Sequence, residues 1–285
     1  MLNKILVTGA TGNAGFEVAK ALASRGLRVK AAVHNAEKAG LLKSTRAERI
    51  AFDLTRPDSW GGALSGVDGL FLVSPTMVPG ILQAVLNFVD KAKASGIKYI
   101  ITLSAKGVEM VDDAPLRQVE KKVESSGIPF THLRPTWFNQ NFSSFHRDGI
   151  AKQGAIYLPA GDAKTAFIDC RDIASVALIC FSQNGHAGKA HTLTGGEALD
   201  HHQVAALISK AIGREVKYRA MSDDEARQGL KALGWPPEAI EYMIMLYGFV
   251  RAGNAADLTP VVEAILKRKP LTFAQFVGDY ADVWK

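Results

Sequence analysis

Residues 5–22 read ILVTGATGNAGFEVAKAL, a stretch that passes from strand-like to helix-like sequence through three glycines. The apolar run at 5–7 is typical of a strand that is buried on both faces. Gly9, Gly12 and Gly15 follow with GxxGxxG spacing, and apolar residues then recur at helical intervals without a proline. The segment therefore predicts a strand, a tight turn and the beginning of a helix.

The missing side chains of this turn indicate an anion site. One glycine lets the chain reverse, a second lets the backbone approach a bulky anion, and a third lets the helix pack closely on the strand. The amides of the first helical turn favour a pyrophosphate through hydrogen bonds and the helix dipole, and Thr11 and Asn13 add short polar side chains. An ordinary strand-to-helix turn is the alternative.

Composition limits the other classes of function. The chain has 285 residues, of which 47% are hydrophobic and 22% charged, enough for a sizeable core. Its net charge of +6 is spread along the sequence, without the basic and aromatic clusters of a nucleic-acid surface. The two cysteines, Cys170 and Cys180, form no CxxC pair and indicate free thiols in a reducing compartment.

Several sites and locations are not expected. The sequence shows no HExxH, GxSxG or GxxxxGK[ST] motif, and His201 and His202 are a poor ligand pair, so no metal site is predicted. The chain goes directly into its first strand without a leader, and no apolar run has the length of a membrane helix. We expect a cytoplasmic protein with no membrane and no nucleic-acid partner.

Strand-like and helix-like segments alternate through the first half of the chain, which predicts a Rossmann-type, doubly wound parallel sheet. In such sheets ligands lie at the carboxyl ends of the strands. Five strand ends should meet there, and the residues at them are Gly9, His34, Asp53, Ser74 and Ser104. The predicted strands after the first are residues 27–33, 49–52, 69–73, 99–103 and 130–133.

The second strand end favours NADPH over NADH. An acidic residue there would hold the ribose hydroxyls and reject a 2′-phosphate, but the chain has His34 and Asn35, followed by Lys38. NADPH is therefore the preferred cofactor and NADH stays open; a solvated loop with a chance histidine and lysine is the alternative. Asp53 either accepts from the adenine amine or caps the following helix.

The predicted domains are a dinucleotide-binding domain, residues 1–153, and a smaller mixed C-terminal lobe, residues 154–285, intertwined with it. The aromatic and methionine stripe at 237–250 is typical of a core helix, but this helix could also roof an acceptor pocket or meet a second subunit. The other predicted elements of this region are strands at 166–169 and 191–194 and helices at 172–181 and 202–212.

Seven segments together resemble the NmrA-like branch of the atypical short-chain dehydrogenases. They are VTGATGNAG, LSAKG, RQVEKKVESSGIPF, THLRPTWFNQNF, FIDCRDIASVA, LTGGEAL and the closing RKPLTFAQFVGDYADVW. The resemblance implies a small NADPH-dependent reductase of quinones, azo or triarylmethane dyes, or conjugated imines. Some members are instead redox sensors that bind the cofactor without known turnover, which is the alternative function.

The resemblance also implies roles for individual residues. Lys121 matches a lysine that contacts the nicotinamide ribose, and Ser104 matches the serine position of the wider superfamily; both are candidate catalytic residues. The predicted cofactor contacts are Gly9, Ala10, Thr11, Gly12, Asn13, Ala14, Gly15, His34, Asn35, Lys38, Asp53, Leu54, Ser74, Pro75, Ser104, Lys121, Pro135, Trp137 and Phe138. Lys121 on a solvated helix face and Ser104 as a hydroxyl that satisfies local amides are the alternatives.

One residue departs from the superfamily pattern. Arg117 occupies the position of the usual general acid, a tyrosine four residues before the lysine. Because an arginine stays protonated, it cannot donate and recover a proton as a phenol does. We therefore expect direct hydride delivery to an already electrophilic acceptor, with water supplying any proton.

Large aromatic residues indicate the acceptor side. The predicted substrate contacts are Trp137, Phe138, Phe167 and Tyr247, which suit a small, planar, aromatic substrate. For Trp137 and Phe138, which follow a strand end, packing in the core is the alternative. The sequence leaves the oligomeric state open between monomer and homodimer.

Overall fold

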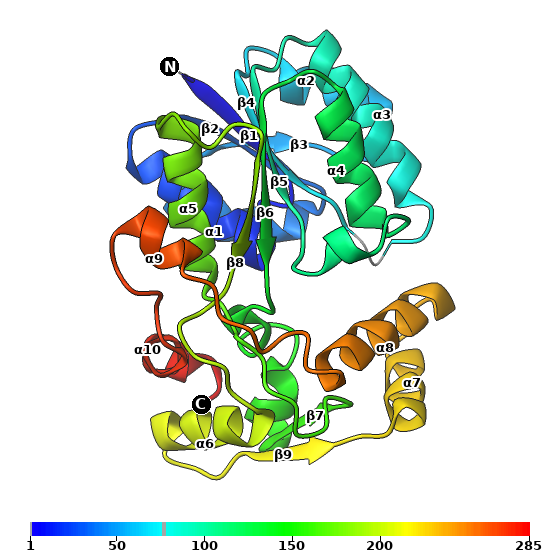
Figure 1. Ribbon diagram of the computed structural model, residues 1–285, viewed down its shortest axis with the longest axis vertical. Coiled ribbons are helices and arrows are strands. Elements are labelled where there is room, and N and C mark those ends of the chain that lie inside the picture. The colour runs from blue at the N-terminus through cyan, green and yellow to red at the C-terminus, as the bar shows by residue number, and fades with distance from the viewer. Residues whose placement is uncertain (1, 76–77) are drawn as a thin grey trace. The chain divides into compact units, whose positions relative to one another are not determined.

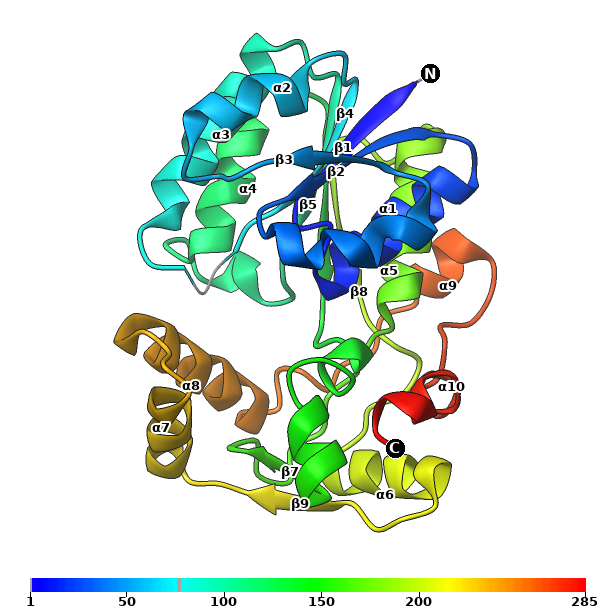
Figure 2. The same cartoon turned by 180° about the vertical axis from the view of Figure 1, so that it is seen from behind.

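The computed structural model describes residues 2–75 and 78–285, which divide into two compact units (Figures 1 and 2). The first unit consists of Met1–Pro135 and Cys170–Leu193, and the second of Thr136–Asp169 and Thr194–Lys285. The predicted domain boundary at residue 153 falls inside the second unit, because the segment from Thr136 to that boundary packs with the rest of this unit.

A parallel sheet of seven strands organises the first unit. Its order is β3-β2-β1-β4-β5-β6-β8, so the chain moves outward from β1 in both directions and a switch point lies between β1 and β4. Strands β1 and β4 are almost wholly buried, as their short apolar runs predicted. The strands are Lys4–Val7 (β1), Arg28–Val33 (β2), Glu48–Ala51 (β3), Gly69–Val73 (β4), Tyr99–Leu103 (β5), Phe130–Pro135 (β6) and Lys189–Leu193 (β8).

Helices cover both faces of this sheet (Figure 1). Helices α1 (Asn13–Ser24) and α5 (Cys170–Ser182) pack together on one face, and α3 (Ile81–Ala94) and α4 (Pro115–Ser125) pack together on the other. The predicted doubly wound fold is therefore confirmed. Shorter helices complete the unit: η1 (Ala36–Thr45), η2 (Pro57–Ser59), α2 (Trp60–Leu64) and η3 (Val108–Met110).

The second unit is mostly helical and has its own aromatic core. Phe142 packs edge to face against Phe167 and Phe273 in this core, and Trp284 is fully buried. Two short parallel strands, β7 (Ala155–Leu158) and β9 (Lys217–Ala220), pair only with each other within the described chain. The helices are η4 (Asn139–Asn141), the π-helical η5 (Gly149–Gln153), α6 (His201–Ile212), α7 (Asp223–Ala232), α8 (Pro237–Arg251), α9 (Val261–Leu266), α10 (Phe273–Tyr280) and η6 (Ala281–Val283).

Two expectations for the C-terminal part need correction. The strand predicted at 166–169 is not a strand, because its backbone makes isolated bridges, such as Ile168 with Phe138, rather than a ladder. The strand predicted at 191–194 is β8, which lies slightly earlier in the chain and belongs to the large sheet.

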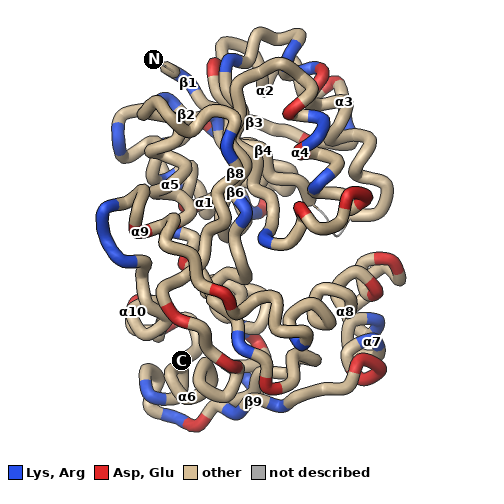
Figure 3. Tube along the Cα trace, viewed as in Figure 1, with Lys and Arg blue, Asp and Glu red and all other residues tan. Residues whose placement is uncertain are grey.

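Charged residues of both signs occur throughout the chain. Basic and acidic residues are interspersed over both units (Figure 3). Among the described helices, none combines the length and the apolar character that a bilayer crossing requires.

Candidate functional site

The glycine turn between β1 and α1 is built so that backbone takes the place of side chains. Gly9 adopts a positive φ of 59°, and its carbonyl accepts from the Gly12 N–H at 2.9 Å. A Cβ on Gly15 would lie 2.2 Å from the Gly9 carbonyl oxygen, so only glycine lets α1 pack this closely. Helix α1 then begins at Asn13 with Gly12 as its N-cap, and among the described residues no side chain caps it.

This turn lies at the switch point of the sheet. A Cβ on Gly9 would meet the Val73 side chain at 3.0 Å, which places the turn against the end of β4. Thr8 fixes the two strand ends, because its hydroxyl accepts from the Val73 N–H at 2.7 Å and is 3.3 Å from the Phe71 carbonyl oxygen. Sequence reasoning missed Thr8; its position directly before the first glycine was the available signal.

The loops after β2 and β3 bring His34 and Asp53 together. His34 Nδ1 is 3.3 Å from Asp53 Oδ2, and the other carboxylate oxygen accepts from the Thr55 amide and hydroxyl. Although partial burial raises the pKa of Asp53, the hydrogen bonds from Thr55 and the nearby His34 and Arg56 keep it below its ordinary value. Asp53 therefore closes a local turn, and its carboxylate faces the histidine.

Asn35 and Lys38 lie on the same loop in different environments. The Asn35 side chain accepts from the Glu37 N–H at 2.8 Å and so caps η1. Lys38 is exposed. The remaining predicted contacts of this edge are Leu54, which is buried, Ser74, which is half-buried, and Pro75, which is exposed.

Ser104 directly follows strand β5, and Pro135 is the last residue of the neighbouring strand β6. The buried Ser104 donates its N–H to the Leu133 carbonyl at 2.7 Å, and Pro135 accepts from the Lys106 N–H at 2.9 Å. Backbone bonds thus hold the chain after β5 against β6.

Helix α4 carries an ion-pair cluster that sequence reasoning did not foresee. The fully buried Glu120 accepts two hydrogen bonds from Arg134, at 2.9 and 2.7 Å, and one from Arg117 at 2.9 Å. Burial alone would raise the pKa of Glu120, but the hydrogen bonds from Arg134 hold it below its ordinary value. The signal for this cluster was an acidic residue three positions after Arg117.

Arg117 and Lys121 are both paired. Arg117 also donates to Glu124, at 2.6 Å, and its hydrogen bonds to this carboxylate and to that of Glu120 raise the pKa of the guanidinium. Arg117 is thus fixed as a structural cation. Lys121 Nζ lies 2.8 Å from Asp112, and its side chain is partly exposed.

The structure brings three of the four predicted substrate aromatics together. Trp137 stacks on Tyr247 with ring centroids 4.9 Å apart, and both line, with Phe167, a cavity of about 10 Å³, which holds about one water molecule. Phe167 otherwise belongs to the core of the second unit. Phe138 is joined to Ile168 by a backbone bridge and does not line this cavity.

A larger apolar cavity of about 460 Å³ lies in the same unit. Its volume is in the range of small-molecule sites. Tyr247 is the one predicted substrate residue on its wall; the others that line it are Phe145, His146, Gly149, Gln153, Ala155, Ile156, Tyr157, Leu158, Pro159, Met221, Ala226, Gly229, Leu230, Leu233, Met243 and Ile244. Sequence reasoning reached Met243 and Ile244 only through the apolar stripe of α8, as a possible roof of an acceptor pocket, and missed the others.

Fold and turn together define the class. A parallel sheet with a glycine turn at its switch point is a Rossmann-type dinucleotide-binding architecture. The chain belongs to the NmrA-like family, whose model matches residues 1–277.

Several relatives resemble the chain over nearly its whole length. It is 33% identical to an NAD(P)H azoreductase of Xenophilus azovorans, covering 97% of this chain and 98% of the relative. It is 31% identical to quinone oxidoreductase 2 of Escherichia coli, covering 98% and 99%. A crystal structure of an NADPH-dependent quinone oxidoreductase from E. coli, in complex with NADPH, superposes with a TM-score of 0.80 at 27% identity, covering 96% of this chain and 99% of that one.

These comparisons confirm the predicted family and, with it, the predicted class of NAD(P)H-dependent reductases.

Proposed function

We propose that the protein is an NADPH-dependent reductase that transfers a hydride to an electron-poor, planar acceptor such as a quinone, an azo dye or an iminium ion. The observation that carries this proposal is the cavity of about 460 Å³, because apolar and aromatic side chains dominate its wall. The names of the azoreductase and quinone oxidoreductase relatives support the same class of acceptor.

The glycine turn fits the cofactor. The backbone of Gly9 and Gly12 is exposed, and the space that a Cβ on Gly15 would need is already filled by backbone. In the proposal, the amides at the beginning of α1 hold the pyrophosphate, and His34 and Lys38 face the 2′-phosphate. When bound, NADPH supplies the hydride.

The ion pairs of α4 restrict the chemical class of acceptor that the protein can reduce. Arg117 cannot act as a general acid, since Glu120 and Glu124 hold its guanidinium in the charged form. The reduction of a quinone to the hydroquinone needs one hydride and one proton, and water supplies the proton after the hydride has arrived. Unactivated ketones need a proton during hydride transfer, so we expect them to be poor substrates.

Two methionines of α8 provide a matched test. Met243 lines the cavity, whereas Met245 is 56% exposed and does not. We expect Met243→Ala to raise the KM for a quinone about tenfold, because it removes roughly 1–2 kcal/mol of apolar contact, and to leave the KM for NADPH unchanged. Met245→Ala should change neither constant; equal effects of the two variants would refute the cavity as the acceptor site.

A panel of acceptors tests the wider proposal. NADPH oxidation is followed by absorbance with quinones, azo dyes, iminium compounds and simple ketones. If calorimetry shows NADPH binding but no acceptor is reduced, the protein is instead a cofactor-sensing regulator, a function that Arg117 in the place of the usual acid would suit.

A further inference from the structure

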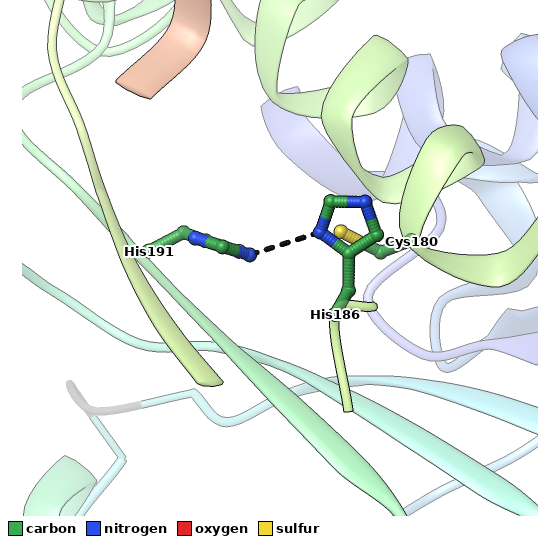
Figure 4. A group of neighbouring side chains, drawn as sticks. All are labelled: Cys180, His186 and His191. Atoms are coloured by element: carbon green, nitrogen blue, oxygen red, sulfur yellow. Dashed lines mark hydrogen bonds between the residues drawn. The ribbon is translucent and has the colours of Figure 1, made fainter. Parts of the chain in front are cut away.

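Cys180, His186 and His191 converge at one edge of the first unit (Figure 4). Cys180 lies near the end of α5, His186 on the following loop, and His191 on the edge strand β8. His186 Nδ1 and His191 Nε2 are 3.1 Å apart, and one ligand atom from each of the three residues lies within 4.8 Å of the other two.

We propose that these three residues form a binding site for a divalent transition metal ion of the zinc class. One thiolate and two imidazoles are a donor set that zinc prefers, and a fourth position stays open for water. On binding, a metal–sulfur bond forms and the cysteine proton passes to solvent, while the two neutral imidazoles bind through their lone pairs.

The spacing of the three ligands is close to that of a tetrahedral site. Zinc bond lengths place two bound nitrogens about 3.3 Å apart and a sulfur and a nitrogen about 3.6 Å apart. The histidine pair already meets the first value. Because the sulfur lies within 4.8 Å of both nitrogens, it needs a movement of at most about one ångström, which side-chain rotation on α5 and the loop can supply.

The surroundings hold the ligands in place and keep the thiol unreactive. The His186 carbonyl accepts from the Thr131 hydroxyl at 2.7 Å, and Thr131 is bound at 2.7 Å by the Tyr99 hydroxyl. Cys180 is buried, and burial raises the pKa of its thiol to about 12, which disfavours a free thiolate nucleophile. The two histidines are half-buried, which leaves a path for an ion from solvent.

A second cluster of metal-ligating residue types is less suited to a cation than the cysteine cluster is. Glu120, Glu124 and His132 also lie within 4.8 Å of one another, but Arg117 and Arg134 already neutralise the carboxylates. The cluster of Cys180, His186 and His191 contains no carboxylate, and Lys189 is the lysine that acts on both rings. The cysteine cluster is therefore the better cation site among the described residues.

The bound ion would brace the sheet rather than take part in hydride transfer. Thr131 and Tyr99 lie at the beginnings of β6 and β5, so the cluster is at the amino end of the strands, whereas the glycine turn follows the carboxyl end of β1. Metal binding would join the end of α5 to the edge strand β8 and raise the melting temperature of the chain.

Cobalt provides a direct probe, since a thiolate bound to Co²⁺ gives a charge-transfer absorption that imidazole alone does not. The metal-free full chain is titrated with Co²⁺ and Zn²⁺, beside the variants Cys180→Ser and His191→Ala. Cys170→Ser, at the other buried cysteine of α5, and His202→Ala, at an exposed histidine, are the matched controls.

We expect one Co²⁺ per chain with the charge-transfer band, and a rise in melting temperature with Zn²⁺. Because loss of an outer-shell partner already costs about 10–100-fold in metal affinity, loss of either ligand should cost at least about 100-fold. The control variants should bind as the wild type does, and activity with NADPH should not depend on the metal. Binding without the thiolate band, unchanged affinity in the correctly folded His191→Ala chain, or no binding would each overturn the proposal.

Discussion

The glycine turn and the apolar cavity are built in opposite ways. The turn is made of backbone, and the space beside Gly15 does not admit a single methyl group. The cavity is made of side chains from several segments of the second unit, and one of its glycines, Gly229, has open space around it. A site made of backbone is therefore intolerant of added atoms, whereas a site made of side chains can be reshaped without loss of the fold.

Gly15→Ala is the strongest test of this difference. Its new methyl group would lie 2.2 Å from the Gly9 oxygen, and real Cβ contacts essentially never fall below 3.0 Å, so α1 must move away from the strand. Because a displacement of about 1 Å can cost about 100-fold in a precisely positioned site, we expect NADPH affinity to fall at least about 100-fold by calorimetry.

The control for this variant is Gly61→Ala in α2 of the same unit. No atom lies within 4 Å of the added Cβ there, so cofactor affinity should not change and stability should stay equal or rise by about 0.5–1 kcal/mol. An affinity within threefold of the wild type for Gly15→Ala would show that the turn does not hold the cofactor.

Gly229→Leu applies the opposite test to the cavity. Gly229 lies in α7 and lines the cavity, so a leucine side chain can enter the open space that the acceptor would occupy. Displacing about 2 kcal/mol of apolar contact should lower kcat/KM for a quinone about 30-fold, with the KM for NADPH unchanged. The melting temperature should not fall, since leucine favours a helix by nearly 1 kcal/mol over glycine.

Gly229→Ala serves as the control, because it improves the helix in the same way but fills little of the cavity. If Gly229→Leu leaves the kinetics of every reduced acceptor intact, the cavity is not the acceptor site.

The first unit could be predicted from sequence because its elements are local. Each central strand is a continuous apolar run, as in residues 5–7, and the turn requires glycines at fixed spacing. The second unit has neither feature. Its strands AIYL and KYRA are short, and they pair with each other across a long separation in the chain, so neither was foreseen.

The predicted site residues also differ in how well local sequence could place them. The glycines lie where the spacing requires, whereas the aromatic residues could be recognised by type but not assigned to a wall or to the core, and Phe167 packs in the core. The cluster of Cys180 with His186 and His191 was missed because loop geometry, and not spacing, brings the ligands together.

The glycine turn and the second unit should also differ in their response to pH. Residues 8–15 carry no ionisable side chain, whereas the second unit buries His201. Burial lowers the pKa of His201 to about 4; Asp200 opposes this shift and His202 adds to it. An unfolded histidine titrates near 6.5, so the unfolded chain binds more protons between these values. The stability that depends on neutral His201 is therefore fully present above about pH 6.5. As the pH decreases toward about 4, it falls by up to about 1.4 kcal/mol per pH unit.

Urea unfolding of wild type and His201→Gln between pH 7 and pH 4, followed by tryptophan fluorescence, measures this contribution. The variant should lose less stability than the wild type over this range. Parallel curves would show that His201 does not contribute to the acid sensitivity.

Lys38→Ala should have the smallest effect, since Lys38 is exposed and its attraction to a 2′-phosphate is screened by solvent and salt. We expect NADPH to bind about 3–5-fold more weakly and NADH to bind unchanged, with the difference vanishing at high salt. Lys43→Ala, at another exposed lysine of η1, is the control and should change neither affinity. An equal loss for both cofactors would mean that Lys38 supports the loop and not the phosphate. In that case the preference must rest on His34, whose imidazole already faces the Asp53 carboxylate at 3.3 Å, and the cofactor preference would be correspondingly weak.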